Sequence, residues 1–442
     1  MPSGGTNRNR LAHEDHDTSH GPSAGRPRFS PRVVLCAFRC SSSLSNPIVI
    51  ATSACDNKVG RGGLGRSTTI EYQTDIPGAT EPQETTRRKK GWPMTTKPLQ
   101  VLFVGGTGTI SASCARSAVA RGMDVTVFTR ARSELRPLPP EVARLTGDLR
   151  EPSSIKAAIG VRYFDVVVNF LCYSADDARI AVETFRGRTG HYLHISTAML
   201  YQKPPRGMPY RESTERVNPF SKYANDKIAA EDVLSEAYSS ESFPVTIVRP
   251  SHTYDEVQPP VPGDWTVIDR LARGDEVVVP GDGTSLWALT HALDFAQGLL
   301  GLFANSAALG EAFHITSDDV YTWDEIYELL ASALEVGARL VHVPSEFFPL
   351  VAPDWGWTGG VLGDLRYSVL LDNSKIRRYV PSFAPAVTFR DTVFDFARWR
   401  QGHPVETAPD PTAEGIIDRL VTGYHLAASA FASLGPAHST SA

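Results

Sequence analysis

The sequence predicts an α/β protein that folds around a doubly wound parallel sheet and carries a smaller C-terminal α+β lobe. Short apolar runs alternate with helical patterns from residue 99 to about residue 250. Apolar strands that alternate with helices indicate a parallel sheet covered on both faces, and right-handed crossovers make that sheet doubly wound. A barrel, the alternative architecture, would repeat similar units around a closed ring, whereas the alternation here breaks after residue 250.

The expected strands of the sheet are short and apolar and cover residues 99–104, 124–128, 143–146, 165–169, 191–195 and 245–248. The clearest helical patterns between them cover residues 109–121, 175–187 and 221–238. Later strands are expected at 277–279, 313–315 and 340–343. A capping box, Thr322-Trp-Asp-Glu325, predicts a helix to about Glu335, and a last helix is expected near 413–433. Residues 344–372, rich in Pro, Gly and aromatics, are expected to form irregular structure on the substrate side.

The first 93 residues differ in kind from the rest. They are dominated by Gly, Ser, Pro, Arg and Asn, with few periodic apolar positions. Such a segment cannot bury enough surface to offset its ordering entropy, so we expect residues 1–93 to form a disordered extension. Met94 stands directly before the first clean strand, which motivates the hypothesis that it is the native start.

Composition limits the function classes. The formal net charge of −5 gives no basic excess, so nucleic-acid binding is not expected. No apolar run approaches the length of a membrane span. The 5 cysteines form no disulfide framework, which favours a reducing cytoplasm, and the scattered histidines suggest no metal site.

A glycine-rich turn, Val104-Gly-Gly-Thr-Gly-Thr-Ile-Ser111, follows the first expected strand and opens the first expected helix. Glycines permit a tight turn and let the backbone approach a pyrophosphate, whose charge the helix N-terminus favours. This context predicts a Rossmann-type NAD(P) site. The residues of the turn that we assign to the cofactor are Gly105, Thr107, Gly108, Thr109 and Ile110.

The ends of later strands extend the predicted cofactor site. The second strand ends in Thr129-Arg130, where NAD enzymes usually place a carboxylate for the ribose; an arginine there favours NADP(H) over NAD(H). A solvated arginine is the alternative. Asp148 is placed to accept a hydrogen bond from the adenine amino group, and Leu149 and Phe170 are assigned to the same site.

Tyr223 and Lys227 lie one turn apart at the start of an expected helix. A free phenol has a pKa of about 10, too high for a base near neutrality. A neighbouring ammonium favours the phenolate, so we expect Lys227 to lower the pKa of Tyr223. Chance pairs of this kind occur on ordinary helices, and the order of the other motifs is what gives this pair weight.

Taken together, residues 98–400 resemble the extended short-chain dehydrogenase/reductases, also called the NAD-dependent epimerase/dehydratase family. The motifs that carry the resemblance follow one another in the expected order: the glycine turn, Gly147-Asp-Leu149, Ile195-Ser-Thr-Ala-Met-Leu-Tyr201, the Tyr223/Lys227 pair, Val248-Arg-Pro-Ser-His-Thr-Tyr254, Gly281-Asp-Gly283 and Thr290-His-Ala-Leu-Asp294. The resemblance implies hydride transfer between a substrate carbon and nicotinamide.

The resemblance also implies residue roles. Tyr223 would take the hydroxyl proton, and Thr197 would hold the substrate oxygen, with Ser196 as its substitute. Lys227 would bind the nicotinamide ribose while tuning Tyr223. Pro250 would line the nicotinamide pocket.

The chain departs from the family pattern at several positions. Ala198-Met199 stand where 4,6-dehydratases have Asp-Glu, and Trp287 and Val361 stand where sugar-nucleotide epimerases have phosphate-binding arginines. Indole and valine cannot replace a guanidinium on phosphate, which disfavours a UDP-sugar. Met199, Trp287 and His252 are assigned to the substrate side, although His252 is equally plausible as a structural histidine. For Trp355 and Trp357, packing within the lobe is favoured over lining the pocket.

These observations predict an NAD(P)-dependent oxidoreductase or epimerase acting on a secondary hydroxyl or carbonyl of a sugar-like or other small polar substrate. A nucleotide-sugar epimerase and a non-catalytic NAD(P)-binding regulatory or RNA-associated protein remain as alternatives. We expect residues 97–255 with about 284–317 to form the cofactor domain, 256–283 with about 318–405 the substrate lobe, and 406–442 a helix and flexible tail. We expect no nucleic-acid or membrane partner and consider a homodimer.

Overall fold

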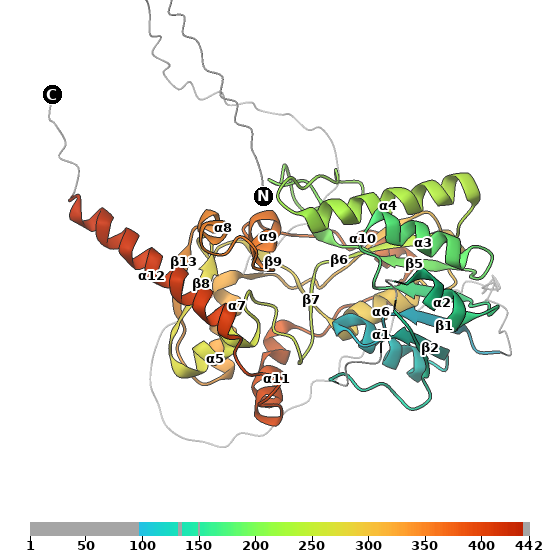
Figure 1. Ribbon diagram of the computed structural model, residues 1–442, viewed down its shortest axis with the longest axis horizontal. Coiled ribbons are helices and arrows are strands. Elements are labelled where there is room, and N and C mark those ends of the chain that lie inside the picture. The colour runs from blue at the N-terminus through green and yellow to red at the C-terminus, as the bar shows by residue number, and fades with distance from the viewer. Residues whose placement is uncertain (1–96, 131–134, 149–150, 436–442) are drawn as a thin grey trace, which may run out of the picture. The chain divides into compact units, whose positions relative to one another are not determined.

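The computed structural model describes residues 97–130, 135–148 and 151–435 of the 442-residue chain (Figure 1). The predicted extension 1–93, the hypothetical start Met94 and the cofactor residue Leu149 lie outside the described residues. The described residues belong to one compact unit, so the division into a cofactor domain and a substrate lobe stays a prediction.

A seven-stranded parallel sheet with the strand order β11-β6-β5-β4-β1-β2-β3 forms the larger part of this unit. Its strands are β1 (Gln100–Val104), β2 (Asp124–Thr129), β3 (Ala143–Thr146), β4 (Val166–Asn169), β5 (Tyr192–Ile195), β6 (Val245–Pro250) and β11 (Ala312–Ile315). The chain runs outward from β1 to β3, then returns to β4 on the other side of β1. The predicted doubly wound α/β fold is confirmed.

Helices cover both faces of the sheet because side chains alternate along each strand. Val101 and Phe103 of β1 pack with α1 (Thr109–Ala120) and α6 (Ala292–Gly301) in one apolar cluster. Leu102 and Val104 pack in a second cluster. The helices of that second face are α2 (Pro152–Ile159), α3 (Ala175–Phe185) and α4 (Lys222–Glu241). The near-continuous apolar character of the predicted strands follows from this burial on both sides.

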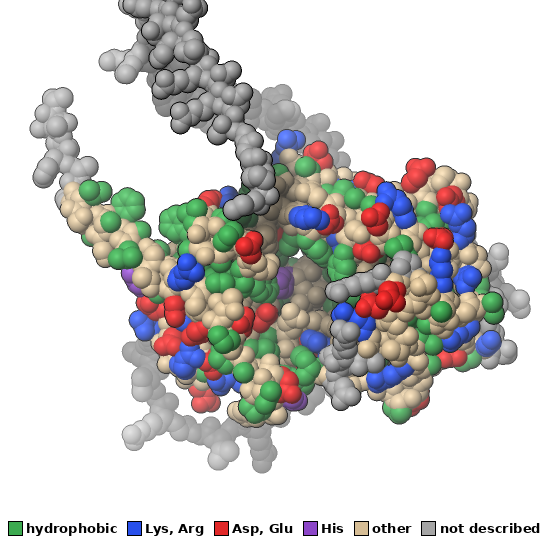
Figure 2. Space-filling model, in the orientation of Figure 1, with side chains coloured by type: hydrophobic (Ala, Val, Ile, Leu, Met, Phe, Trp, Pro, Cys, Tyr) green, Lys and Arg blue, Asp and Glu red, His purple; other side chains and the backbone are tan. Residues whose placement is uncertain are grey.

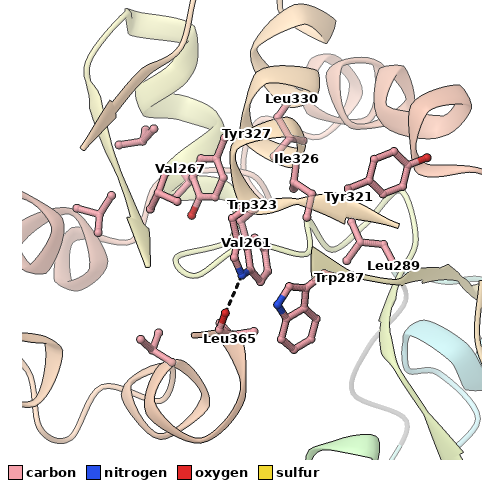
Figure 3. Packing of buried hydrophobic residues seen from close by; sticks show 14 of the residues in the cluster. Val261, Val267, Trp287, Leu289, Tyr321, Trp323, Ile326, Tyr327, Leu330 and Leu365 are labelled. Atoms are coloured by element: carbon pink, nitrogen blue, oxygen red, sulfur yellow. Dashed lines mark hydrogen bonds between the residues drawn. The ribbon is translucent and has the colours of Figure 1, made fainter. Parts of the chain in front are cut away.

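A smaller lobe surrounds a third apolar cluster that is rich in aromatic side chains. Its main elements are α5 (Trp265–Arg273), α7 (Trp323–Ala333), α11 (Phe389–Gly402), α12 (Pro411–Ser433) and the parallel pair β8 (Glu276–Pro280) and β13 (Arg339–Val343). Figure 3 shows the centre of this cluster, where the indole of Trp323 donates a 2.8 Å hydrogen bond to the carbonyl of Leu365. The capping box predicted at Thr322 is present, because its side chain accepts from the backbone of Glu325.

Short elements complete the described chain. Two-residue and three-residue strands pair as β7 (His252–Tyr254) with β10 (Leu289–His291), and β9 (Leu286–Trp287) with β12 (Tyr321–Thr322). The segment expected to be irregular contains α8 (Phe348–Val351), α9 (Thr358–Gly360) and a π-helical turn at Val361–Leu365. Single turns of 3-10 helix lie at Ala198–Leu200, Ser306–Ala308 and Ser345–Phe347.

Two helices near the C-terminus pack against different apolar clusters. The helix α10 (Ser374–Tyr379) lies in the sequence range assigned to the substrate lobe, but its Ile376 packs with the sheet cluster. The first half of α12 packs through Ile416, Ile417 and Leu420 against the smaller lobe. Among the described residues, no helix has both the length and the apolar character needed to cross a membrane.

Three buried histidines lie in or directly before strands of the sheet: His191 precedes β5, His194 lies in β5 and His314 lies in β11. Burial lowers the pKa of His191 to about 4 and that of His314 to about 3, and it holds the pKa of His194 well below its ordinary value. The Nε2 atom of His191 lies 2.7 Å from the hydroxyl of Thr246. All three side chains are therefore neutral in the folded protein near neutral pH.

We expect His191→Gln to weaken the acid sensitivity of the fold. Below pH 6.5 the unfolded chain binds a proton at His191, whereas the folded chain does so only near pH 4, so this residue's contribution to stability is lost as the pH falls through that window. The loss is about 1.4 kcal/mol per pH unit for one proton. Urea unfolding of both proteins at several pH values measures it; equal slopes below pH 6.5 would contradict the assignment.

Candidate active site

A cavity of about 900 Å³ opens at the carboxyl ends of the sheet strands. It lies beside β1 and β4, where the strand order reverses, which is the usual ligand position in open α/β sheets. Figure 2 shows the molecule hollowed between the part that holds the sheet and the smaller lobe. The predicted residues that line the cavity are Gly105, Thr107, Gly108, Thr109, Ile110, Thr129, Arg130, Asp148, Phe170, Ser196, Thr197, Tyr223, Lys227, Pro250 and His252.

The glycine turn joins β1 to α1 at one end of the cavity. Gly105 has a φ of +84°, in the region that favours glycine. A Cβ at Gly106 would lie 2.5 Å from Cγ1 of Val127, so the backbone passes too close to β2 for any side chain. The N–H of Gly108 donates to the hydroxyl of Ser111 at 2.8 Å. The turn therefore presents bare backbone and the N-terminus of α1 to the cavity, an arrangement that fits a dinucleotide pyrophosphate.

Lys227 holds the start of α4 against the sheet. Its ammonium donates to the carbonyls of Cys172 and Ile195 at 2.7 and 2.8 Å, and the side chain is 1% exposed. The hydroxyl of Ser221 caps the helix by accepting from the backbone of Ala224. Lys227 and Tyr223 are one helical turn apart, with Nζ 5.9 Å from the centre of the Tyr223 ring.

The pKa of Tyr223 differs from the sequence expectation. Burial is the largest effect and raises it to about 12, with the Tyr173 phenol adding to the rise and a hydrogen bond with Thr197 opposing it. The ring is 41% exposed, but this exposed part faces the cavity. The expected lowering by Lys227 is not found. Burial instead lowers the pKa of Lys227 to about 8.

Thr197 and Ser196 follow β5 at the floor of the cavity. The hydroxyl of Thr197 accepts from the backbone N–H of Met199 at 3.2 Å and caps the short turn that follows. The hydroxyl of Ser196 is buried, lines the cavity and has no hydrogen-bond partner among the described residues. Buried hydroxyls normally have partners, so this one fits a bound ligand.

His252 lines the same cavity. Burial lowers its pKa to about 4, which makes the imidazole neutral near pH 7. Its ring stacks on Trp357 with the centroids 6.3 Å apart, and Trp287 meets it edge-on at 6.0 Å. Trp357 packs against the apolar cluster of the smaller lobe, as the sequence favoured, and also lines the cavity. Trp355 packs in the same lobe, stacked on Phe348.

Two residues assigned to the substrate do not line the cavity. Trp287 is 1% exposed and packs against Trp323, so it lies behind His252. Met199 is turned toward Ser221, whose hydroxyl lies 3.3 Å from its sulfur. The cavity is also lined by Tyr173, Asp177 and Gln258, which were not among the predicted site residues. Tyr173 and Asp177 come soon after β4 at the carboxyl edge of the sheet, which was the available signal.

Polar groups at the cofactor end complete the fit to a dinucleotide. Arg130 is exposed at the cavity beside Thr129, and Asp148 lies at the end of β3. Thr109, the first residue of α1, donates to the side-chain oxygen of Gln258 and accepts from Arg136, both at 3.1 Å. In the part of the chain that the structure describes, no cluster of three or more His, Cys, Asp or Glu side chains is arranged to hold a metal ion.

Residues 101–316 match the family model described as the NAD dependent epimerase/dehydratase family. The chain is 27% identical over 252 residues to 2'-dehydrokanamycin reductase of Streptomyces kanamyceticus, with 56% of this chain and 70% of that protein covered. It is 27% identical over 246 residues to a chloroplast stem-loop binding protein of Arabidopsis thaliana (53% and 63% covered). It is 31% identical over 215 residues to a dTDP-glucose 4,6-dehydratase of Actinoplanes (48% and 61% covered). The chain thus spans about three fifths of the last two proteins.

Solved structures share the fold. An epimerase from Methanothermobacter thermautotrophicus matches with a TM-score of 0.59 and 17% identity, covering 70% of this chain and 94% of that one. A dTDP-glucose 4,6-dehydratase from Streptomyces venezuelae, solved with NAD bound, matches with a TM-score of 0.57 and 23% identity, covering 68% and 97%.

Proposed function

Because the chain belongs to the NAD-dependent epimerase/dehydratase family, a branch of the extended short-chain dehydrogenase/reductases, we propose that it is an NAD(P)-dependent oxidoreductase or epimerase. Its substrate is a sugar-like or other small polar molecule with a secondary hydroxyl or carbonyl. One observation carries the proposal: a single cavity contains the glycine turn together with Thr197, Tyr223 and Lys227.

The chemistry of the chain's own residues follows from their protonation states. A bound nicotinamide would supply or accept the hydride. With a pKa of about 12, Tyr223 is protonated at neutral pH, so in the direction of reduction it donates its proton to the carbonyl oxygen. The Thr197 hydroxyl orients that oxygen. The ammonium of Lys227 lies one turn away, with Nζ 5.9 Å from the centre of the Tyr223 ring.

The substrate end of the cavity supports an uncharged or non-nucleotide substrate. Trp287 and Val361, at the positions where a diphosphate would need arginines, are buried in the apolar cluster of the smaller lobe. Ala198 is buried and Met199 faces Ser221, so neither supplies the acid and base of a 4,6-dehydratase. The relative named for reducing 2'-dehydrokanamycin favours a net reductase, whereas the relatives named as dTDP-glucose dehydratases favour the nucleotide-sugar alternative.

The similarity to a stem-loop binding protein favours one alternative, a protein that binds RNA. The formal net charge of −5 provides no basic excess for a phosphate backbone. Oxidation of NADPH with candidate carbonyl compounds, measured beside binding of a stem-loop RNA, separates the two functions. RNA binding without any turnover would favour the alternative.

We further propose a cellular compartment and an oligomeric state for the protein. The free, buried thiols of Cys114 and Cys172 are compatible with the reducing cytoplasm expected from the sequence. A homodimer and the absence of nucleic-acid and membrane partners are proposed on the sequence alone.

We predict that Tyr223→Phe binds the cofactor normally but loses turnover by roughly 10²–10⁴-fold, because the phenolic proton is gone while the ring remains. The matched control is Tyr238→Phe on the same helix, whose ring lies away from the cavity lining. Steady-state rates and cofactor titration measure the two properties. Near-normal turnover in Tyr223→Phe would remove the phenol from the mechanism.

We also propose that NADP(H) is preferred over NAD(H), and we predict that Arg130→Ala selectively weakens NADPH binding, by about tenfold for a loss of 1.4 kcal/mol. NADH affinity should change little. Fluorescence titration of both nucleotides, with Arg121→Ala at the far end of α1 as the control, tests this. Tighter binding of NADH by the unaltered protein would refute the preference.

A further inference from the structure

Asp264 has an unusual backbone conformation. Its φ of 48° and ψ of −126° are those of the first central residue of a type II′ turn, a position that glycine ordinarily occupies. The other described non-glycine residues with positive φ are Ser242, Ala304 and Glu335, which follow the ends of α4, α6 and α7, where left-handed backbone is common. Asp264 instead precedes α5. Strain of this kind persists only where the surrounding structure enforces it.

The carboxylate of Asp264 does not serve the helix that it precedes. Aspartate is among the preferred capping residues, yet the side chain of Asp264 makes no capping hydrogen bond to α5. The polar side-chain groups of Gln258 and Trp357 lie close enough to this carboxylate to oppose the effect of burial on its pKa. Its Oδ1 atom is buried and has no partner among the described residues.

Both partners of Asp264 belong to the cavity wall. Trp357 lines the cavity and carries the stacked ring of His252. Gln258 also lines the cavity, and its side-chain oxygen accepts the hydrogen bond from Thr109 at the start of α1. Asp264 therefore contacts two parts of the cavity wall. One is the stacked pair of Trp357 and His252, called here the Trp357–His252 platform, and the other is Gln258, which is hydrogen-bonded to Thr109 at the cofactor turn.

We propose that Asp264 is a positioning residue whose strained backbone directs its carboxylate onto Gln258 and Trp357, and that it thereby sets the affinity of the cavity for its substrate. The inference rests on the proposed function, because the ligand is the substrate of that reaction. The substrate feature selected is a flat, uncharged ring face that packs on the Trp357–His252 platform.

The decisive variant is Asp264→Gly, which removes the carboxylate and accepts the backbone conformation without strain. We expect a melting temperature equal to or above that of the unaltered protein. We expect KM for the carbonyl substrate to rise by about tenfold while kcat changes less, because Gln258 and Trp357 lose the carboxylate that positions them. Hydrogen exchange in peptides that cover residues 256–262 and 354–360 should become faster.

Two further variants separate positioning from general stability. Glu335→Gly relieves a positive φ at a site that does not line the cavity, so it should leave KM and exchange in both peptides unchanged. Asp264→Asn keeps one oxygen acceptor and the shape of the side chain, and it should restore part of the affinity lost in Asp264→Gly.

Several results would overturn the inference. A lower melting temperature for Asp264→Gly with unchanged KM would make Asp264 a structural residue. If Asp264→Gly had the melting temperature, the KM and the hydrogen exchange of the unaltered protein, Asp264 would not position the cavity wall. If the unaltered protein oxidised no NADPH with any carbonyl compound, the proposed function would fail, and exchange and melting temperature would then decide on Asp264 by themselves.

Discussion

A buried ammonium holds the site together. Lys227 is 1% exposed, and its hydrogen bonds to the carbonyls of Cys172 and Ile195 tie α4 to the segment that follows β4 and to the last residue of β5. These two strands are neighbours in the parallel sheet. The position of α4, and with it that of Tyr223, is therefore fixed relative to Thr197, which follows β5 directly. Removing the lysine side chain would leave the two buried carbonyls without this donor, which is expensive in a low-dielectric interior.

The remaining geometry depends on a parallel sheet that brings the ends of distant segments to one edge. The glycine turn, Thr197 and Pro250 lie far apart in sequence but line one cavity. Trp357 of the smaller lobe, stacked on His252, lines the same cavity. A dinucleotide fits the backbone-rich end, where the N-terminus of α1 is exposed, and the aromatic end is the one that we propose for the substrate. The two ends meet at Tyr223.

The strands, the glycine turn and the Tyr223/Lys227 pair were predictable because they depend on local pattern and on strand order. The placement of Trp287 behind His252 was not, since it depends on packing within the smaller lobe, whose aromatic residues come from many short segments. The pKa of Tyr223 was also mispredicted. The one-turn spacing to Lys227 is visible in the sequence, but the burial that dominates the pKa is a property of the folded cavity.

Native mass spectrometry of the full chain incubated with NADPH, and separately with NADH, tests the central claim that this cavity holds a nicotinamide dinucleotide. The account predicts a folded species that carries one dinucleotide per chain and releases it on unfolding. A folded chain that retains neither nucleotide, at concentrations that saturate ordinary dehydrogenases, would contradict it.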